Sequence, residues 1–135
     1  MTEPPEPRLS AEERALFDKG VAEFNAGLYF ECHESLEDVW MGVRGPTRDF
    51  FQGLIQVSVA FHHLAHGNLG GARSTLGRAR KRLEPYPDRY YGFDLAAHRN
   101  LLGYWLARIE AQDSAALAES PPTWRFDPPK PAAHC

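Results

Sequence analysis

The chain has 135 residues and carries 15 Lys and Arg against 18 Asp and Glu, which gives a formal net charge of -3. This length fits one domain that buries a core without disulfide staples. The mild acidity favours neither nucleic acid nor an anionic membrane surface as a partner, and no apolar run is long enough to cross a bilayer. Cys32 and Cys135 lie too far apart to indicate a disulfide framework, so a reducing cytoplasm is the expected compartment.

The composition divides the chain into three regions. Residues 1–8 are acidic and proline-rich, unlike a secretory signal, and are expected to form a disordered leader. Residues 9–112 are expected to form a helical bundle, and residues 113–135 a proline-rich extended tail. Ser10 and Glu13 can form a capping box that starts the first helix, which a left-handed glycine, Gly27, would end.

The second helix, from about residue 28 to 41, carries ionisable groups inside its apolar face. At about 100° per residue, its large apolar side chains cover most of the circumference and leave one narrow strip for water. His33 and Glu37 fall in the middle of the apolar arc, with Glu34 at its margin. Burial of such groups is costly unless they are paired. We therefore expect a site on this helix, with His33 and Glu37 facing inward.

The third helix, from residue 48 to 66, is apolar over nearly its whole surface and is expected to be central. Its exceptions, Gln52, Gln56 and His63, share one narrow stripe because their spacing is four and seven residues. Gly53 comes level with Glu37 in the hairpin of the second and third helices, where it would allow a close approach of the two backbones.

The fourth helix begins after Asn68, which can cap it, and Pro85 ends it. Asp94 can cap a fifth helix that frays from residue 114. Trp124 and Phe126 would pin the tail across the bundle. No segment shows the period of a strand, so the expected fold is all-α, a single antiparallel bundle of about five helices. Five inner positions are expected on the fifth helix: Leu95, His98, Leu102, Trp105 and Ile109.

The hairpin of the second and third helices predicts a polar cluster in which amides lie near carboxylates and an imidazole. Its members are His33, Glu34, Glu37, Trp40, Gln52 and Gln56. This cluster could be a structural network with Trp40 as core filler, or it could recognise a ligand. It could also perform acid–base hydrolysis through Glu34 or Glu37, although Cys32 points away from His33 and no other nucleophile is evident.

A metal site is a further alternative, since side chains four residues apart on a helix can ligate one ion. The candidates are His33, Glu37, His62 and His66. The second histidine of the zinc-protease motif is missing, as is the repeated Glu-x-x-His of di-iron bundles. A protein without a cofactor is therefore expected rather than one that binds a metal ion.

The fourth helix carries a run of basic side chains with no acid before Glu84. They are Arg73, Arg78, Arg80, Lys81 and Arg82. This run is a candidate patch for a phosphate-bearing ligand or an acidic partner, although such runs are usually solvated surface. No stacking aromatic residues alternate with the arginines, so nucleic acid is disfavoured.

Three stretches, FNAGLYFECHESLEDVW, FQGLIQ and GNLGGA, together resemble a small bacterial and archaeal family called domain of unknown function 309. The resemblance spans roughly residues 11–110 and implies a compact all-helical domain with no established activity, cofactor or substrate. It implies that His33, Glu34, Glu37 and Trp40 carry the family's His-Glu-x-x-Glu-x-x-Trp signature. Cys32 stands where the family usually has alanine.

The functional hypothesis is a non-catalytic binding or interaction module, whose partner is a small polar ligand or a protein and which is compatible with homo-oligomers. The first alternative is the metal-assisted or acid–base hydrolase. The second is a scaffold similar to tetratricopeptide repeats, because the turns at Gly27 and Gly67 have that style. These glycines are forty residues apart, whereas that repeat has a period of about thirty-four.

Overall fold

A computed structural model of the chain describes residues 4–113 and 118–128. Within these ranges the chain forms five helices, and the predicted all-α bundle is confirmed. The elements are α1 Ala11–Asn25, α2 Tyr29–Gly42, α3 Thr47–Ala65, α4 Leu69–Leu83, β1 Arg89–Tyr90, β2 Phe93–Asp94 and α5 Leu95–Glu110. No helix in the described ranges has the length and apolar content that a membrane span requires.

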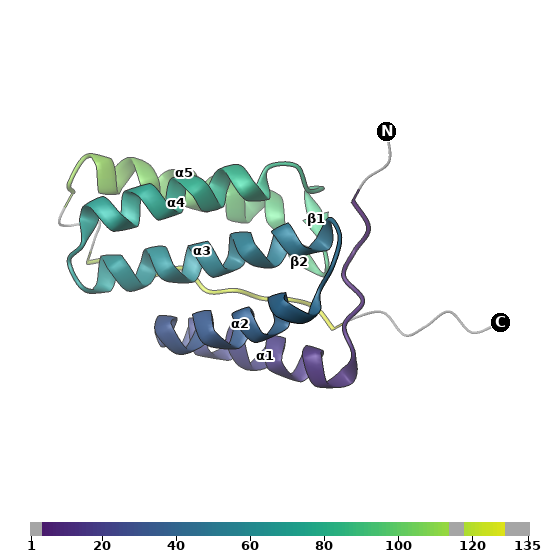
Figure 1. Cartoon of the computed structure of the whole chain (residues 1–135). Helices are drawn as coiled ribbons and strands as arrows, with labels where there is room; N and C mark the ends of the chain where they lie inside the picture. The colour runs from purple at the N-terminus through teal and green to yellow at the C-terminus, as the bar shows by residue number, and fades with distance from the viewer. Residues whose placement is uncertain (1–3, 114–117, 129–135) are drawn as a thin grey trace.

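The helices are arranged so that α3 has a neighbour on each side. It packs against α2 and against α4, while α1 packs on α2 and α5 on α4 (Figure 1). Successive helices alternate in direction, so α2 and α4 begin at the same end of the bundle and α3 runs the opposite way. Because α3 is flanked on both sides, most of its residues are buried.

Local capping rules fix most helix ends. Ser10 Oγ accepts a hydrogen bond from the Glu13 N–H at 3.1 Å, and the Glu13 carboxylate accepts one from the Ser10 N–H at 3.0 Å. Asn68 and Asp94 each accept a hydrogen bond from the N–H three residues on, at 2.9 and 3.1 Å. Gly27 has φ +78°, the left-handed conformation expected after α1. These four sequence signals are therefore confirmed.

Aromatic side chains dominate the core. The ring of Phe17 packs edge-on against Phe51 at a centroid distance of 5.6 Å, and Phe61 contacts Trp105 in the same way at 5.4 Å. Such pairs stabilise a core beyond the area they bury. The five predicted inner positions of α5 are confirmed, since each is at most 4% exposed: Leu95, His98, Leu102, Trp105 and Ile109.

A small β-hairpin lies between α4 and α5, although no segment of the sequence shows the period of a strand. Arg89 pairs with Asp94 and Tyr90 with Phe93, in an antiparallel ladder of two residues per strand. The connecting turn has positive φ at both positions, 52° at Tyr91 and 72° at Gly92, as this kind of tight hairpin turn requires. Strands this short contain too few residues to display an alternating pattern, so periodicity could not detect them.

Residues 118–128 follow the bundle as an extended segment that packs against α1. Trp124 is 2% exposed, and its ring stacks on Phe24 at a centroid distance of 3.7 Å. The Asn25 side chain exchanges two hydrogen bonds with the Trp124 backbone, at 2.7 and 2.8 Å. The ring of Phe126 stacks on Phe93 at 4.1 Å. This segment therefore completes one side of the core.

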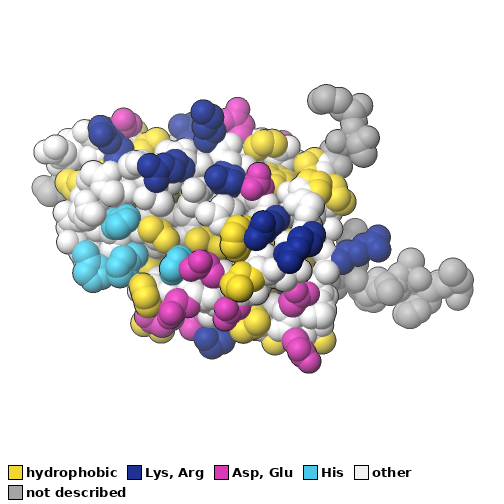
Figure 2. Space-filling model, viewed as in Figure 1, with side chains coloured by type: hydrophobic (Ala, Val, Ile, Leu, Met, Phe, Trp, Pro, Cys, Tyr) yellow, Lys and Arg dark blue, Asp and Glu magenta, His cyan; other side chains and the backbone are white. Residues whose placement is uncertain are grey.

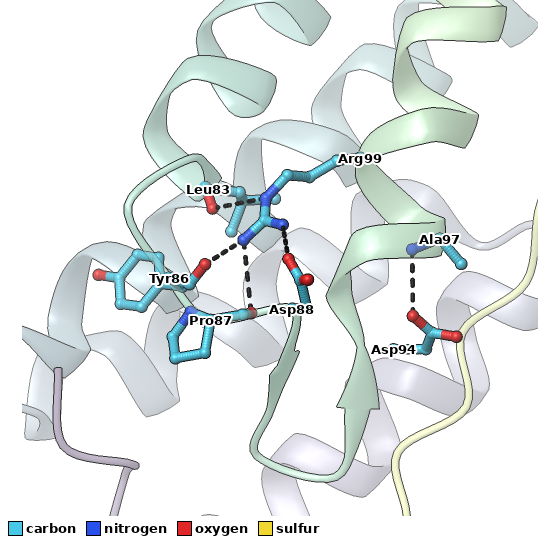
Figure 3. A network of polar contacts seen from close by, with 7 residues as sticks. All are labelled: Leu83, Tyr86, Pro87, Asp88, Asp94, Ala97 and Arg99. Carbon is cyan, nitrogen blue, oxygen red and sulfur yellow. Dashed lines mark hydrogen bonds and ion pairs between the residues drawn. The ribbon is translucent and has the colours of Figure 1, made fainter. Parts of the chain in front are cut away.

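An arginine joins α5 to the loop after α4. The Arg99 guanidinium donates to the carbonyl oxygens of Leu83 at 3.3 Å, Tyr86, and Pro87 at 3.4 Å, and it pairs with Asp88 at 3.2 Å (Figure 3). The close view shows all four groups converging on one planar side chain. A fork of several N–H donors can bind all of these groups, namely the Leu83 carbonyl, which the end of α4 leaves without a helical partner, and two carbonyls of the loop that follows.

Candidate functional site

Five half-buried side chains of α3 form one stripe along its outer side. They lie three or four residues apart at Arg48, Gln52, Gln56, Val59 and His63. Gln52, Gln56 and His63 share this stripe as their spacing predicts. We call the outer surface of α2, α3 and α4, with this stripe at its centre, the three-helix face.

His33, Glu37 and Trp40 of α2 line one side of this stripe. His33 Nε2 contacts Glu37 Oε1 at 2.6 Å, and the two side chains are 28% and 45% exposed. Glu34 is exposed as well. The expectation that His33 and Glu37 are buried inside the bundle is therefore wrong. Their arc of α2 lies along the outer edge of α3, where no described element covers it.

The glutamines of α3 do not meet this imidazole and carboxylate as expected. Gln56 Oε1 accepts a hydrogen bond from Arg82 Nε of α4 at 3.2 Å, and Arg82 also pairs with Asp49 at 2.8 Å. Gln52 has no hydrogen-bond partner among the described residues. Gly53 faces α4 instead of α2, since a Cβ there would lie 2.6 Å from Leu83 Cδ2. The glycine therefore serves the close contact of α3 with α4.

Trp40 and Arg48 form a contact that sequence reasoning missed. The Arg48 guanidinium carbon lies 3.8 Å from the centroid of the Trp40 ring, a cation–π distance. Arg48 Nε is buried and has no hydrogen-bond partner among the described residues. Trp40 is half-buried, not the core filler that one interpretation predicts. The signal that could have found Arg48 is its spacing, four residues before Gln52 on the same stripe.

A shallow hollow of about 200 Å³ lies at the other end of α2, where the α2 and α3 side chains meet. It is lined by Tyr29, Phe30, His33, Val59 and His62. Phe30 is 51% exposed, and its ring lies 5.8 Å from that of His33 and 6.0 Å from that of His62. The floor is apolar and two imidazoles stand at its edge. Such a hollow can receive an apolar group with a polar atom beside it.

The histidines gather at this end of the face. The rings of His62 and His66 lie 4.4 Å apart, and burial and the nearby His66, His63 and His33 lower the pKa of His62. The predicted metal ligands thus form two pairs, His33 with Glu37 and His62 with His66. Within the described ranges no group of three or more His, Cys, Asp or Glu side chains is arranged to hold a metal.

Cys32, the residue before His33, lies on the side of α2 that is opposite to the three-helix face. Its side chain is fully buried, and desolvation raises the pKa of its thiol to about 12. The thiol is therefore protonated at neutral pH. This agrees with the expectation that Cys32 is a small core residue and not a nucleophile for His33.

The two edges of the three-helix face have opposite charge. α2 carries four acids and no Lys or Arg, whereas α4 carries five bases and no acid. Figure 2 shows the acidic side chains mainly in its lower half, over α1 and α2, and Lys and Arg mainly above them, with the histidines at one end.

The predicted anion patch on α4 is largely exposed. Arg73, Arg78, Arg80 and Lys81 are exposed and form no ion pair within the described residues, whereas Arg82 is held by Asp49 and Gln56. Lys81 lines two open hollows of about 450 and 280 Å³. The basic side chains are therefore free to meet an acidic group from outside the molecule.

Comparisons with known proteins agree with the resemblance that the sequence of α2 and α3 indicates. Residues 17–75, which contain α2, α3 and the start of α4, match the family model "Domain of unknown function (DUF309)". The chain is similar to an uncharacterized protein of Aquifex aeolicus (strain VF5), with 26% identity over 93 residues. That alignment covers 68% of this chain and 28% of the Aquifex protein. The predicted resemblance to this family is therefore confirmed, over residues 17–75.

Proposed function

We propose that this chain is a protein-interaction module that docks a partner on the three-helix face. One observation carries the proposal. Four large apolar side chains are exposed in the described ranges, and three of them, Leu28, Phe30 and Met41, lie on α2 or directly before it. Apolar exposure concentrated on one helix, beside polar side chains, is typical of an interaction site.

The polar groups of the face support the same function. Arg48 offers a cation that is stacked on Trp40 and forms no ion pair among the described residues. Gln52 adds an amide that has no hydrogen-bond partner in the part of the chain that the structure describes. Tryptophan and arginine are the residue types that most often dominate the energy of interfaces. A partner that covers this stripe would satisfy these groups and bury the exposed apolar surface together.

The shape of the face favours a protein over a small polar ligand. The hollow beside Phe30 measures about 200 Å³, below the roughly 300–1,000 Å³ of most small-molecule sites. This hollow is a shallow part of the three-helix face, which is about 25 Å long because its helices have about that length. The hollow suits one anchoring side chain of a partner, and the rest of the face suits its rim.

The test is photo-crosslinking in the native host with p-benzoylphenylalanine at position 30. The matched control carries the same group at position 104, because Tyr104 of α5 is also exposed, at 43%, and lies off the three-helix face. We expect position 30 to form a discrete covalent adduct and position 104 to form none. Absence of an adduct from position 30, or equal adducts from both positions, would contradict the proposal.

A further inference from the structure

We infer that the partner docked on the three-helix face is a second copy of this chain. The inference rests on the proposed function and adds the identity of the partner. It depends on the distribution of charge between the outer helices of this face, with four acids on α2 and five bases on α4, of which Arg80 lies against α5.

These opposite charges cannot neutralise one another within a single molecule. Packed helix axes lie about 8–10 Å apart, so α2 and α4, with α3 between them, are separated by about 16–20 Å. Screening in physiological salt acts over about 8 Å. Apart from the pair of Glu37 with His33 and that of Arg82 with Asp49, these side chains form no ion pair within the described residues. The charges are therefore available to a partner.

A face with one acidic and one basic edge is complementary to itself under a two-fold axis. An axis parallel to α3, lying in the plane of contact, places the α2 edge of each copy against the α4 edge of the other. The contact is isologous, so each opposite-charge contact occurs twice. The same axis brings the α3 stripes of the two copies together at the centre.

The positions of the charged side chains along α2 and α4 also match under this axis. An axis parallel to α3 keeps each residue at its own height, and α2 and α4 begin at the same end of the bundle. At about 1.5 Å per residue, Glu37 lies about 12 Å from the start of α2 and Arg78 about 14 Å from the start of α4. Phe30 comes opposite Gly70 and Gly71, two residues in the first turn of α4 that have no side chain to obstruct a ring.

The first experiment is sedimentation of the full chain over a range of concentrations and at two ionic strengths. We expect a reversible dimer that salt weakens, because the contact depends on charges between the copies. A chain that remains monomeric up to about 1 mM would overturn the inference.

Charge reversal then tests the arrangement. An acid-edge variant, Glu34→Lys with Asp38→Lys, and a base-edge variant, Arg78→Glu with Lys81→Glu, alter exposed side chains without ion pairs in the described ranges. Each variant places like charges opposite one another twice per dimer, and we expect self-association to fall by about tenfold or more.

Mixing the two variants is the decisive step. In a mixed dimer each altered edge faces the altered edge of the other copy, so opposite charges meet again on both sides. We expect the mixture to associate within about threefold of the wild-type affinity, since the number of opposite-charge contacts is restored. The control Glu12→Lys with Glu110→Lys makes the same change in net charge as the acid-edge variant, but on α1 and α5, and it should associate like the wild type.

The outcomes separate this inference from the proposed function. If the position-30 crosslink yields an adduct of two copies of this chain, both stand. If it yields an adduct with a different protein while the chain sediments as a monomer, the interaction face stands and the second copy is excluded. A dimer that both variants leave unchanged would overturn the two-fold arrangement.

Discussion

His98 is a titratable side chain inside the core. It is 4% exposed, its ring lies 4.9 Å from Phe93 and 6.3 Å from Trp124, and its Nε2 atom has no partner within the described part of the chain. Desolvation lowers the pKa of His98 from 6.5 to about 4, because the surrounding rings cannot solvate an imidazolium. The residue is therefore neutral in the folded protein and packs as an aromatic ring.

This burial predicts a loss of stability in mild acid. The pKa of His98 is higher in the unfolded chain, so the unfolded state binds the proton more readily and is stabilised relative to the folded state as the pH falls below 6.5. The contribution of His98 is complete above that pH and is lost as the pH falls toward about 4. Between about pH 7.5 and about pH 5 we expect a loss of about 2 kcal/mol.

Urea unfolding of wild type and His98→Phe at these two pH values measures the effect. The variant keeps an aromatic ring and removes the titrating group. Between these two pH values its free energy of unfolding should therefore fall by about 2 kcal/mol less than that of the wild type. An equal fall in both proteins would show that His98 does not carry the effect.

At the scale of the elements, Arg99 links α5 to the end of α4. Its side chain is 19% exposed and reaches three carbonyl oxygens and the Asp88 carboxylate (Figure 3). Arg99→Ala leaves part-buried carbonyl groups without donors, and we expect it to lower the free energy of unfolding by about 2 kcal/mol.

Arg89→Ala is the matched control in a denaturant titration. Arg89 is 62% exposed and its described partner is the Asp127 carboxylate, so its removal should cost less than about 1 kcal/mol. Equal losses in the two variants would mean that the carbonyl contacts of Arg99 contribute nothing measurable.

The elements also separate what the sequence could predict from what it could not. The starts of α1, α4 and α5 follow from Ser10, Asn68 and Asp94, because a cap acts within three residues of itself. The direction in which Gly53 points, and the exposure of His33 and Glu37, depend on which neighbour covers each arc of a helix. Periodicity gives the angles between side chains on one helix but not the rotation of that helix against the bundle.

At the scale of the whole molecule, the signature of α2 and the stripe of α3 lie together on an open surface. The sequence placed each set on one arc of its helix but assigned both sets to the interior, because an amphipathic pattern does not distinguish a covered arc from one left for a partner. The family match extends over α2, α3 and the start of α4, which form most of this surface.

We propose that the three-helix face serves binding and not folding, and the stability of the double variant His33→Ala with Glu37→Gln tests this proposal. The pair is partly exposed, and surface ion pairs contribute about 0–1 kcal/mol. In urea unfolding of the monomer we predict a loss of less than about 1 kcal/mol, against about 3 kcal/mol for Leu36→Ala, a fully buried residue of the same helix. A loss for the double variant as large as that of Leu36→Ala would contradict the account, because the pair would then be holding the fold.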